Sequence, residues 1–181
     1  MKSDNFLSIF VLLALISCLI TAATVHAGDS IESAGDILAY FLPATAAGLT
    51  IAFKDFKGTV QFAESTAFAL GATIALKYMT NETRPNGDRY SFPSGHSAAS
   101  FASAEFIRKR YGWEYGVPAY AVAAFVAYSR VEARQHYTHD VVAGAAIGIA
   151  SSYLFTKPYK GWGLQPEATS KYYGMRLIRG W

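Results

Sequence analysis

Apolar residues recur along most of the chain at steps of three and four, which is the spacing of one face of an α-helix. No sustained alternation of apolar and polar residues occurs before the carboxyl-terminal tail. Five segments carry the helical pattern: residues 31–53, 59–80, 97–110, 117–130 and about 136–156. The sequence therefore predicts an all-α domain, a helical bundle of about five core helices.

The chain begins with a segment that is typical of an export signal. An apolar run at residues 6–23 follows Lys2 and ends before Val25-His26-Ala27, whose small residues at alternate positions resemble a signal-peptidase site. We predict a signal peptide at residues 1–27. The alternative is an uncleaved membrane anchor, because the 18 residues of the run are near the lower length of a membrane span, about 17. The core domain then covers residues 28–160, and a tail covers 161–181, where weak alternation over 172–178 favours a short strand or an interfacial segment.

Composition places this helical domain at a membrane. Apolar residues make up 52% of the chain and charged residues 16%, against roughly 45–50% and about 25% in soluble domains. Uncharged stretches at 37–53, 115–129 and 141–156 are shorter than the roughly 20 residues of a full span, so the pattern leaves their crossing open. Gly144 and Gly148, four residues apart, predict close contact with another helix.

Charge and cysteine content exclude several classes of partner. The net charge is only +3, and basic residues form short clusters rather than a stripe, so no nucleic-acid partner is expected. Cys18 is the single cysteine, which rules out an intramolecular disulfide and a cysteine-ligated metal centre. No pattern in the sequence indicates the oligomeric state.

Basic clusters at one set of helix ends predict the orientation in the membrane. They include Lys54, Lys57, residues 108–110 and the basic residues of the tail. Positive loops remain in the cytoplasm, and a leader that exports Gly28 gives the same orientation. The opposite helix ends are therefore expected on the periplasmic side of a bacterial-type inner membrane.

Residues capable of catalysis gather in the connections on that outer side. Three clusters occur there: Lys77 with Arg84-Pro85, then Pro93-Ser94-Gly95-His96, then Ser129-Arg130 with His136 and Asp140. Successive helices run in opposite directions, so all three clusters are expected at one end of the bundle. We predict that they form one site.

The basic members of these clusters are suited to an anionic substrate. Lys77, Arg84 and Arg130 supply three cations, enough to neutralise a phosphate dianion and the charge that develops during phosphoryl transfer. Each residue alone has a simpler interpretation: a snorkelling lysine, a turn cap, or an ion pair of Arg130 with Glu132 or Asp140. The three together favour a phosphate site.

The other members supply backbone donors and two histidines. Ser94 and Gly95 precede a helical run, so free N–H groups there can face an anion, although an ordinary capped helix start is the alternative. His96 at this position is suited to act as a general acid. His136 and Asp140 are four apart, so the carboxylate can accept the Nδ1 proton and leave Nε2 as a nucleophile, although such a pair is also found in structural and metal sites.

A catalytic metal is not expected. The carboxylates of Asp88, Glu132 and Asp140 are scattered, so none of them completes a coordination shell. His139 lies about 100° around a helix from Asp140, and we interpret it as a bystander.

The order and spacing of the three clusters resembles the tripartite signature of the type 2 phosphatidic acid phosphatase (PAP2) superfamily. Every motif position from Lys77 to Asp140 is filled. The resemblance implies a PAP2-like domain in which His136 is the nucleophile that forms a phosphohistidine, Asp140 orients it, and His96 is the general acid and later the base for water. It further implies that the phosphoryl group is held by Lys77, Arg84, Ser94, Gly95 and Arg130, with no metal and no cofactor.

The same superfamily contains integral lipid phosphatases, soluble periplasmic acid phosphatases and vanadate-dependent haloperoxidases. We predict a phosphatase that hydrolyses a phosphate monoester or diphosphate of a membrane lipid, because charged residues are few. The alternative is a soluble periplasmic acid phosphatase of broad specificity, favoured by the short apolar stretches and by Glu64 within a proposed span. A haloperoxidase is disfavoured because those relatives are generally much larger, and a membrane scaffold that has kept the motif is the non-enzymatic alternative.

Overall fold

The computed structural model describes residues 28–159, 161–169 and 172–180. The predicted leader at 1–27 lies outside this part of the chain. The elements are α2 (Gly28–Ala52), α3 (Phe56–Thr80), α4 (Gly95–Tyr111), α5 (Trp113–Glu132), α6 (Thr138–Phe155), β1 (Gly161–Thr169) and β2 (Tyr172–Gly180). The predicted all-α bundle is confirmed, and each predicted helix is present with boundaries shifted by a few residues.

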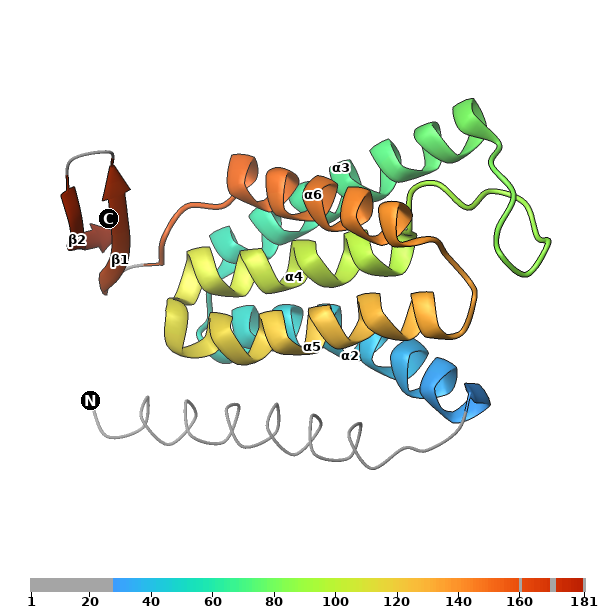
Figure 1. The fold of residues 1–181 in the computed structure, drawn as a ribbon. Helices are drawn as coiled ribbons and strands as arrows, with labels where there is room; N and C mark the ends of the chain where they lie inside the picture. The colour runs from blue at the N-terminus through green and yellow to red at the C-terminus, as the bar shows by residue number, and fades with distance from the viewer. Residues whose placement is uncertain (1–27, 160, 170–171, 181) are drawn as a thin grey trace.

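Helix α4 lies in the middle of the bundle, between α3 and α6 on one side and α2 and α5 on the other (Figure 1). Its position follows from its sequence, because small residues on all of its faces let four neighbours approach. Ser94 caps its first turn by accepting a hydrogen bond from the Ser97 N–H. The apolar core lies mainly among α2, α4 and α5, where the largest fully buried side chains include Leu42, Phe106 and Val126.

Glycines let α6 lie against the backbone of α4. A Cβ atom added at Gly144 would lie 2.3 Å from the Ser94 carbonyl oxygen, and one at Gly148 would lie 2.3 Å from the Ala98 carbonyl oxygen. No real Cβ tolerates such a distance, so both positions require glycine. The close helix contact predicted from the four-residue spacing is therefore confirmed, and α4 is its partner.

The outward face of α3 is more apolar than its inward face. Its buried residues are all small or polar: Gly58, Ser65, Ala69 and Thr73. Its exposed side chains include several large apolar groups: Phe56, Val60, Phe68, Leu70, Ile74 and Tyr78. This is the reverse of the pattern of a soluble amphipathic helix.

A buried ion pair between Asp55 and Arg110 connects several elements at the end of the bundle where α3 begins. Asp55 accepts hydrogen bonds from the Gly58 N–H at 3.0 Å and from Arg110 Nε at 2.7 Å. Arg110 Nη1 also donates to the Lys157 carbonyl oxygen at 2.6 Å. The connection between α2 and α3, the end of α4 and the chain after α6 are thereby fixed to one another.

The tail forms a hairpin of two antiparallel strands, in which Gly161 pairs with Gly180 and Thr169 with Tyr172. Of the two predictions for residues 172–178, the short strand is correct and corresponds to β2. Its partner β1 was not predicted, because Gly161, Gly163 and Pro166 remove the alternation that marks a strand.

The glycine contact predicts a difference between two alanine substitutions. Gly148→Ala should destabilise the protein by about 1–3 kcal/mol, because the added methyl overpacks a rigid backbone contact. Gly71→Ala in α3 should be neutral or slightly stabilising, since nothing lies within 4 Å of the added Cβ and alanine is the better helix former. Thermal unfolding of both variants in detergent measures this difference. Equal unfolding temperatures would contradict the proposed tight contact.

Candidate active site

The residues of the three sequence clusters lie at one end of the bundle, on the right in Figure 1. This end is built from the carboxyl termini of α3 and α5, the amino termini of α4 and α6, and the two connections between them. The beginning of α2 also reaches it. The predicted convergence of residues more than fifty positions apart therefore occurs in the structure.

The centre of this end is a buried histidine–carboxylate pair. His136 Nδ1 lies 3.3 Å from Asp140 Oδ2, and their side chains are 3% and 0% exposed. The same oxygen accepts hydrogen bonds from the Tyr137 N–H at 2.9 Å and from the Ser91 hydroxyl. With the proton on Nδ1, the carboxylate fixes the ring and leaves the Nε2 lone pair free for a substrate.

The surroundings keep this imidazole neutral. Burial, followed by the positive charges of Lys77 and Arg84, holds the pKa of His136 well below its ordinary value, and Asp140 opposes this only in part. A neutral ring is the form that can act as a nucleophile. The same two cations are those expected to receive a phosphate.

Lys77 and Arg84 are anchored next to this pair. Lys77 Nζ donates to the Tyr90 carbonyl oxygen at 2.6 Å, across the connection between α3 and α4. Arg84 Nη1 donates to Gln135 Oε1 at 2.9 Å, and its buried Nε has no hydrogen-bond partner among the described residues. Arg84 therefore keeps a donor available for an anion.

The start of α4 meets the start of α6 through the backbone. The Ser94 N–H donates to the Asp140 carbonyl oxygen at 2.9 Å, which fixes the two helix starts together. A Cβ added at Gly95 would have a single neighbour within 4 Å, Thr73 Cγ2 at 3.9 Å. Packing of the described residues therefore does not require glycine here, and the open space leaves room for a ligand to approach the backbone.

The structure adds a residue that sequence reasoning missed, Asp36 of α2. Its Oδ1 lies 2.6 Å from Arg130 Nη1 and 3.3 Å from His96 Nε2. Arg130 Nη2 also donates to the Glu32 carbonyl oxygen at 2.6 Å. The alternative partners for Arg130 considered from the sequence, Glu132 and Asp140, are wrong. No local signal marks Asp36, because its partners are 60 or more positions away.

Glycine again permits this contact. A Cβ added at Gly35 would lie 1.9 Å from Ser129 Oγ and 2.5 Å from Arg130 Nη2. Helix α2 can therefore reach the arginine only because residue 35 lacks a side chain. Gly35 and Asp36 together make α2 a component of the site.

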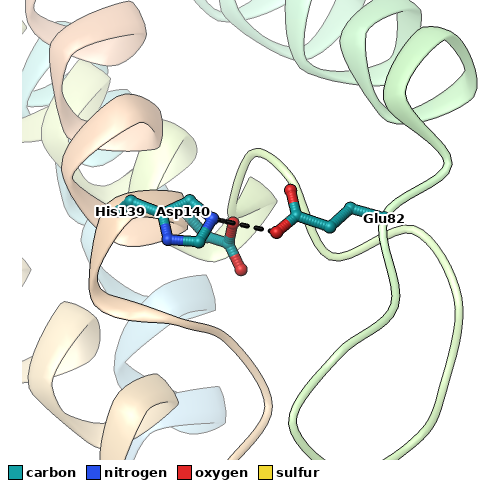
Figure 2. A group of neighbouring side chains, drawn as sticks. All are labelled: Glu82, His139 and Asp140. Carbon is teal, nitrogen blue, oxygen red and sulfur yellow. Dashed lines mark hydrogen bonds and ion pairs between the residues drawn. The ribbon is translucent and has the colours of Figure 1, made fainter.

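His139 lies closer to Asp140 than its helical position suggested. Its Nε2 lies 3.0 Å from Glu82 Oε1 and 3.1 Å from Asp140 Oδ1, and Figure 2 shows the three side chains side by side. The angular argument fails because Asp140 is in the first turn of α6 and directs its carboxylate back toward the Tyr137 N–H. This brings Asp140 Oδ1 toward the ring of His139.

Known proteins resemble the chain in sequence and in fold. The family model of the PAP2 superfamily matches residues 86–162. A lipid A 4'-phosphatase of Helicobacter pylori is 34% identical over 80% of this chain and 79% of its own length. A lipid A 1-phosphatase of Porphyromonas gingivalis is 42% identical over 44% of this chain and 19% of its own length. The crystal structure of Aquifex aeolicus LpxE has a TM-score of 0.60 at 22% identity, over 77% of this chain and 92% of that one.

Fold, site and sequence similarity together define the class of this protein as a helical-bundle phosphatase, an enzyme that hydrolyses phosphoric esters. The chain belongs to the PAP2 superfamily. The resemblance drawn from Lys77 to Asp140 is thereby confirmed as a family relationship.

Asp36 predicts an effect on pH dependence. Burial and then the charge of Arg130 lower the pKa of His96, while Asp36 raises it. Asp36→Asn should lower this pKa further, so less His96 is protonated at a given pH. If His96 is the general acid, the alkaline limb of the kcat/KM profile then moves to lower pH. Steady-state assays across pH measure the shift, and Glu132→Gln, an exposed acid at the same end, is the control. An unchanged alkaline limb in Asp36→Asn would contradict this role.

Proposed function

We propose that this protein removes a phosphate group from a membrane lipid through a phosphohistidine formed on His136. The observation that carries the chemistry is the buried His136–Asp140 pair, 3.3 Å apart, beside the cations of Lys77 and Arg84. Positive groups at this place neutralise the phosphate and stabilise charge in the transition state. Family membership supports the same chemistry.

In the proposed first step, Nε2 of His136 attacks phosphorus and the bond between phosphorus and the lipid oxygen breaks. His96 donates a proton to the departing oxygen. In the second step, His96 takes a proton from water as the water oxygen attacks phosphorus, which releases phosphate and restores His136. The phosphoryl oxygens are held in both steps by the charges of Lys77, Arg84 and Arg130 and by the N–H groups at the start of α4.

Two features of the helices support a lipid as the substrate. One described helix, over Ile31–Ala52, is long and apolar enough to cross a membrane. The large exposed side chains of α3, such as Phe68 and Ile74, are suited to hydrocarbon, while its inward face is small and polar. A bundle with this exterior brings its site to lipid phosphates at the membrane surface.

The relatives support a narrower substrate class. Both relatives described above carry names of lipid A phosphatases, one for the 4' position and one for the 1 position. We therefore propose a phosphorylated glycolipid of the lipid A type as the substrate. The 4' position is favoured, because that relative matches over most of both chains.

We further propose that the site faces the periplasm from the inner membrane. Lys54, Lys57 and residues 108–110 lie at the end of the bundle opposite the site. Basic residues concentrate on the cytoplasmic side of membrane proteins. The orientation therefore places the connection between α3 and α4 outside.

Phosphate release by the purified protein tests the substrate class. With lipid A, phosphatidate, phosphatidylglycerophosphate, a prenyl diphosphate and p-nitrophenyl phosphate presented at equal concentration, kcat/KM should be highest for lipid A. Mass spectrometry of the product identifies which phosphate has been removed. Higher activity on soluble esters, with the protein partitioning into buffer rather than detergent, would favour a soluble acid phosphatase. No release from any substrate would favour a non-enzymatic role.

The two histidines should fail in different ways. His136→Ala should form no phosphoenzyme, because the nucleophile is absent. His96→Ala should lose about 10²–10⁴-fold in activity on a lipid phosphate, and less on p-nitrophenyl phosphate, whose leaving group needs little protonation. Quenching without acid, after reaction with labelled substrate, detects the acid-labile, base-stable phosphohistidine. Phosphoenzyme in His136→Ala together with none in His96→Ala would mean that the roles are reversed.

Orientation can be measured separately from activity. Cysteine at Gly87 should react with an impermeant thiol reagent in intact cells, because this loop is expected outside, whereas cysteine at Lys109 should react only after permeabilisation. Both substitutions are made in a Cys18→Ser background so that a single thiol is present. Preferential labelling at position 109 in intact cells would overturn the orientation.

A further inference from the structure

A second group of potential ligands lies directly beside the His136–Asp140 pair: Glu82, His139 and Asp140 (Figure 2). Glu82 follows the end of α3, and the other two residues are in the first turn of α6. The Glu82 carboxylate and the His139 ring are partly exposed, so this group is open to solvent. One oxygen or nitrogen from each side chain lies within 4.8 Å of the others.

One atom of this group is buried without a hydrogen bond. Asp140 Oδ1 has no hydrogen-bond partner among the described residues, although the side chain is 0% exposed. The other oxygen, Oδ2, contacts His136 Nδ1 and accepts hydrogen bonds from the Ser91 hydroxyl and the Tyr137 N–H. A buried carboxylate oxygen without a donor is costly. Oδ1 lies 3.1 Å from His139 Nε2 without hydrogen-bond geometry. A positively charged partner at this position would stabilise the buried oxygen.

The other two ligands are held in place before any ion binds. The His139 ring stacks on Tyr137, with 5.4 Å between ring centroids, and on Phe92 at 5.9 Å. The Glu82 carbonyl oxygen accepts a hydrogen bond from the Ser91 N–H at 2.8 Å, which fixes this part of the loop beside Asp140. The His139 ring and the backbone of Glu82 are therefore already positioned beside Asp140, which reduces the entropy lost on binding an ion.

Two of the three separations between ligand atoms, those made by His139 Nε2, fit a small divalent cation. With bonds of about 2.0–2.1 Å, neighbouring ligand atoms lie about 3.3 Å apart at a tetrahedral ion and about 2.9 Å apart at an octahedral one. The two contacts made by His139 Nε2 are 3.0 and 3.1 Å. One imidazole nitrogen with two carboxylate oxygens is a donor set that suits zinc and similar transition metals.

We propose that Glu82, His139 and Asp140 form a binding site for a divalent transition-metal ion such as Zn²⁺, and that the bound ion inhibits the phosphatase. The inhibitory half of this proposal rests on the proposed function, and the binding half does not. An ion on Oδ1 withdraws negative charge from Asp140, which then orients His136 less firmly and stabilises its positive charge less during transfer. The ion takes no part in the reaction itself.

Direct binding tests the site independently of activity. Full-length protein in detergent, freed of metal with EDTA and then exchanged into buffer, is titrated with Zn²⁺ in a calorimeter. We expect one site, with affinity reduced by about tenfold or more in both Glu82→Gln and His139→Ala. Asp88→Asn, which removes another carboxylate from the same loop as Glu82, is the matched control and should bind like wild type.

Activity assays test the inhibition. In EDTA, Glu82→Gln and His139→Ala should hydrolyse substrate at the wild-type rate. Added Zn²⁺ should inhibit the wild type and Asp88→Asn but not these two variants. Equal zinc affinity in all four proteins would overturn the site and would mean that His139 only bridges two carboxylates. Binding that is lost in both variants, together with a wild-type rate unaffected by zinc, would overturn the inhibition. A wild type inactive in EDTA would instead overturn the proposed function, while the titration still decides the site.

Discussion

The contact between the backbones of α4 and α6 is the constraint on which the arrangement of this end of the bundle depends. Gly144 and Gly148 let the helices approach until the Ser94 N–H reaches the Asp140 carbonyl oxygen. This one contact places the start of α4 next to the histidine–aspartate pair. A methyl group between the helices would separate them. The missing side chains of the two glycines thus set the distance between the start of α4 and the His136–Asp140 pair, which are expected to act on one phosphate.

Two carboxylates from different helices contact the two histidines of the site. Asp36 of α2 faces Arg130 and His96, while Asp140 of α6 faces His136. Each histidine therefore has its own carboxylate, one partly exposed and one fully buried. This difference in environment separates a ring suited to proton transfer with solvent from one suited to attack, which is the division of labour that the PAP2 resemblance implies.

The sequence predicted the helices and the convergence of the site well, for a physical reason. Helical periodicity is local, and alternating helices necessarily bring every second connection to the same end. The sequence did not predict ion pairs that depend on the packing of distant helices. Asp36 and Arg130, for example, are 94 positions apart. It also misjudged His139, because side-chain direction in a first turn follows capping rather than the regular angle per residue. The first strand of the hairpin was missed because its glycines and proline carry no alternation.

The ion pair between Asp36 and Arg130 also bears on how the protein is made. Helix α2 is synthesised long before residue 130, so in the proposed membrane setting its carboxylate enters an apolar environment without a partner. An unpaired aspartate at the centre of a span costs roughly 2.5–3.5 kcal/mol during insertion, and less near the end of a helix, where Asp36 lies. The later pairing of Asp36 with Arg130 of α5 offsets this cost. The contact that completes the site therefore also stabilises α2 in the proposed membrane setting.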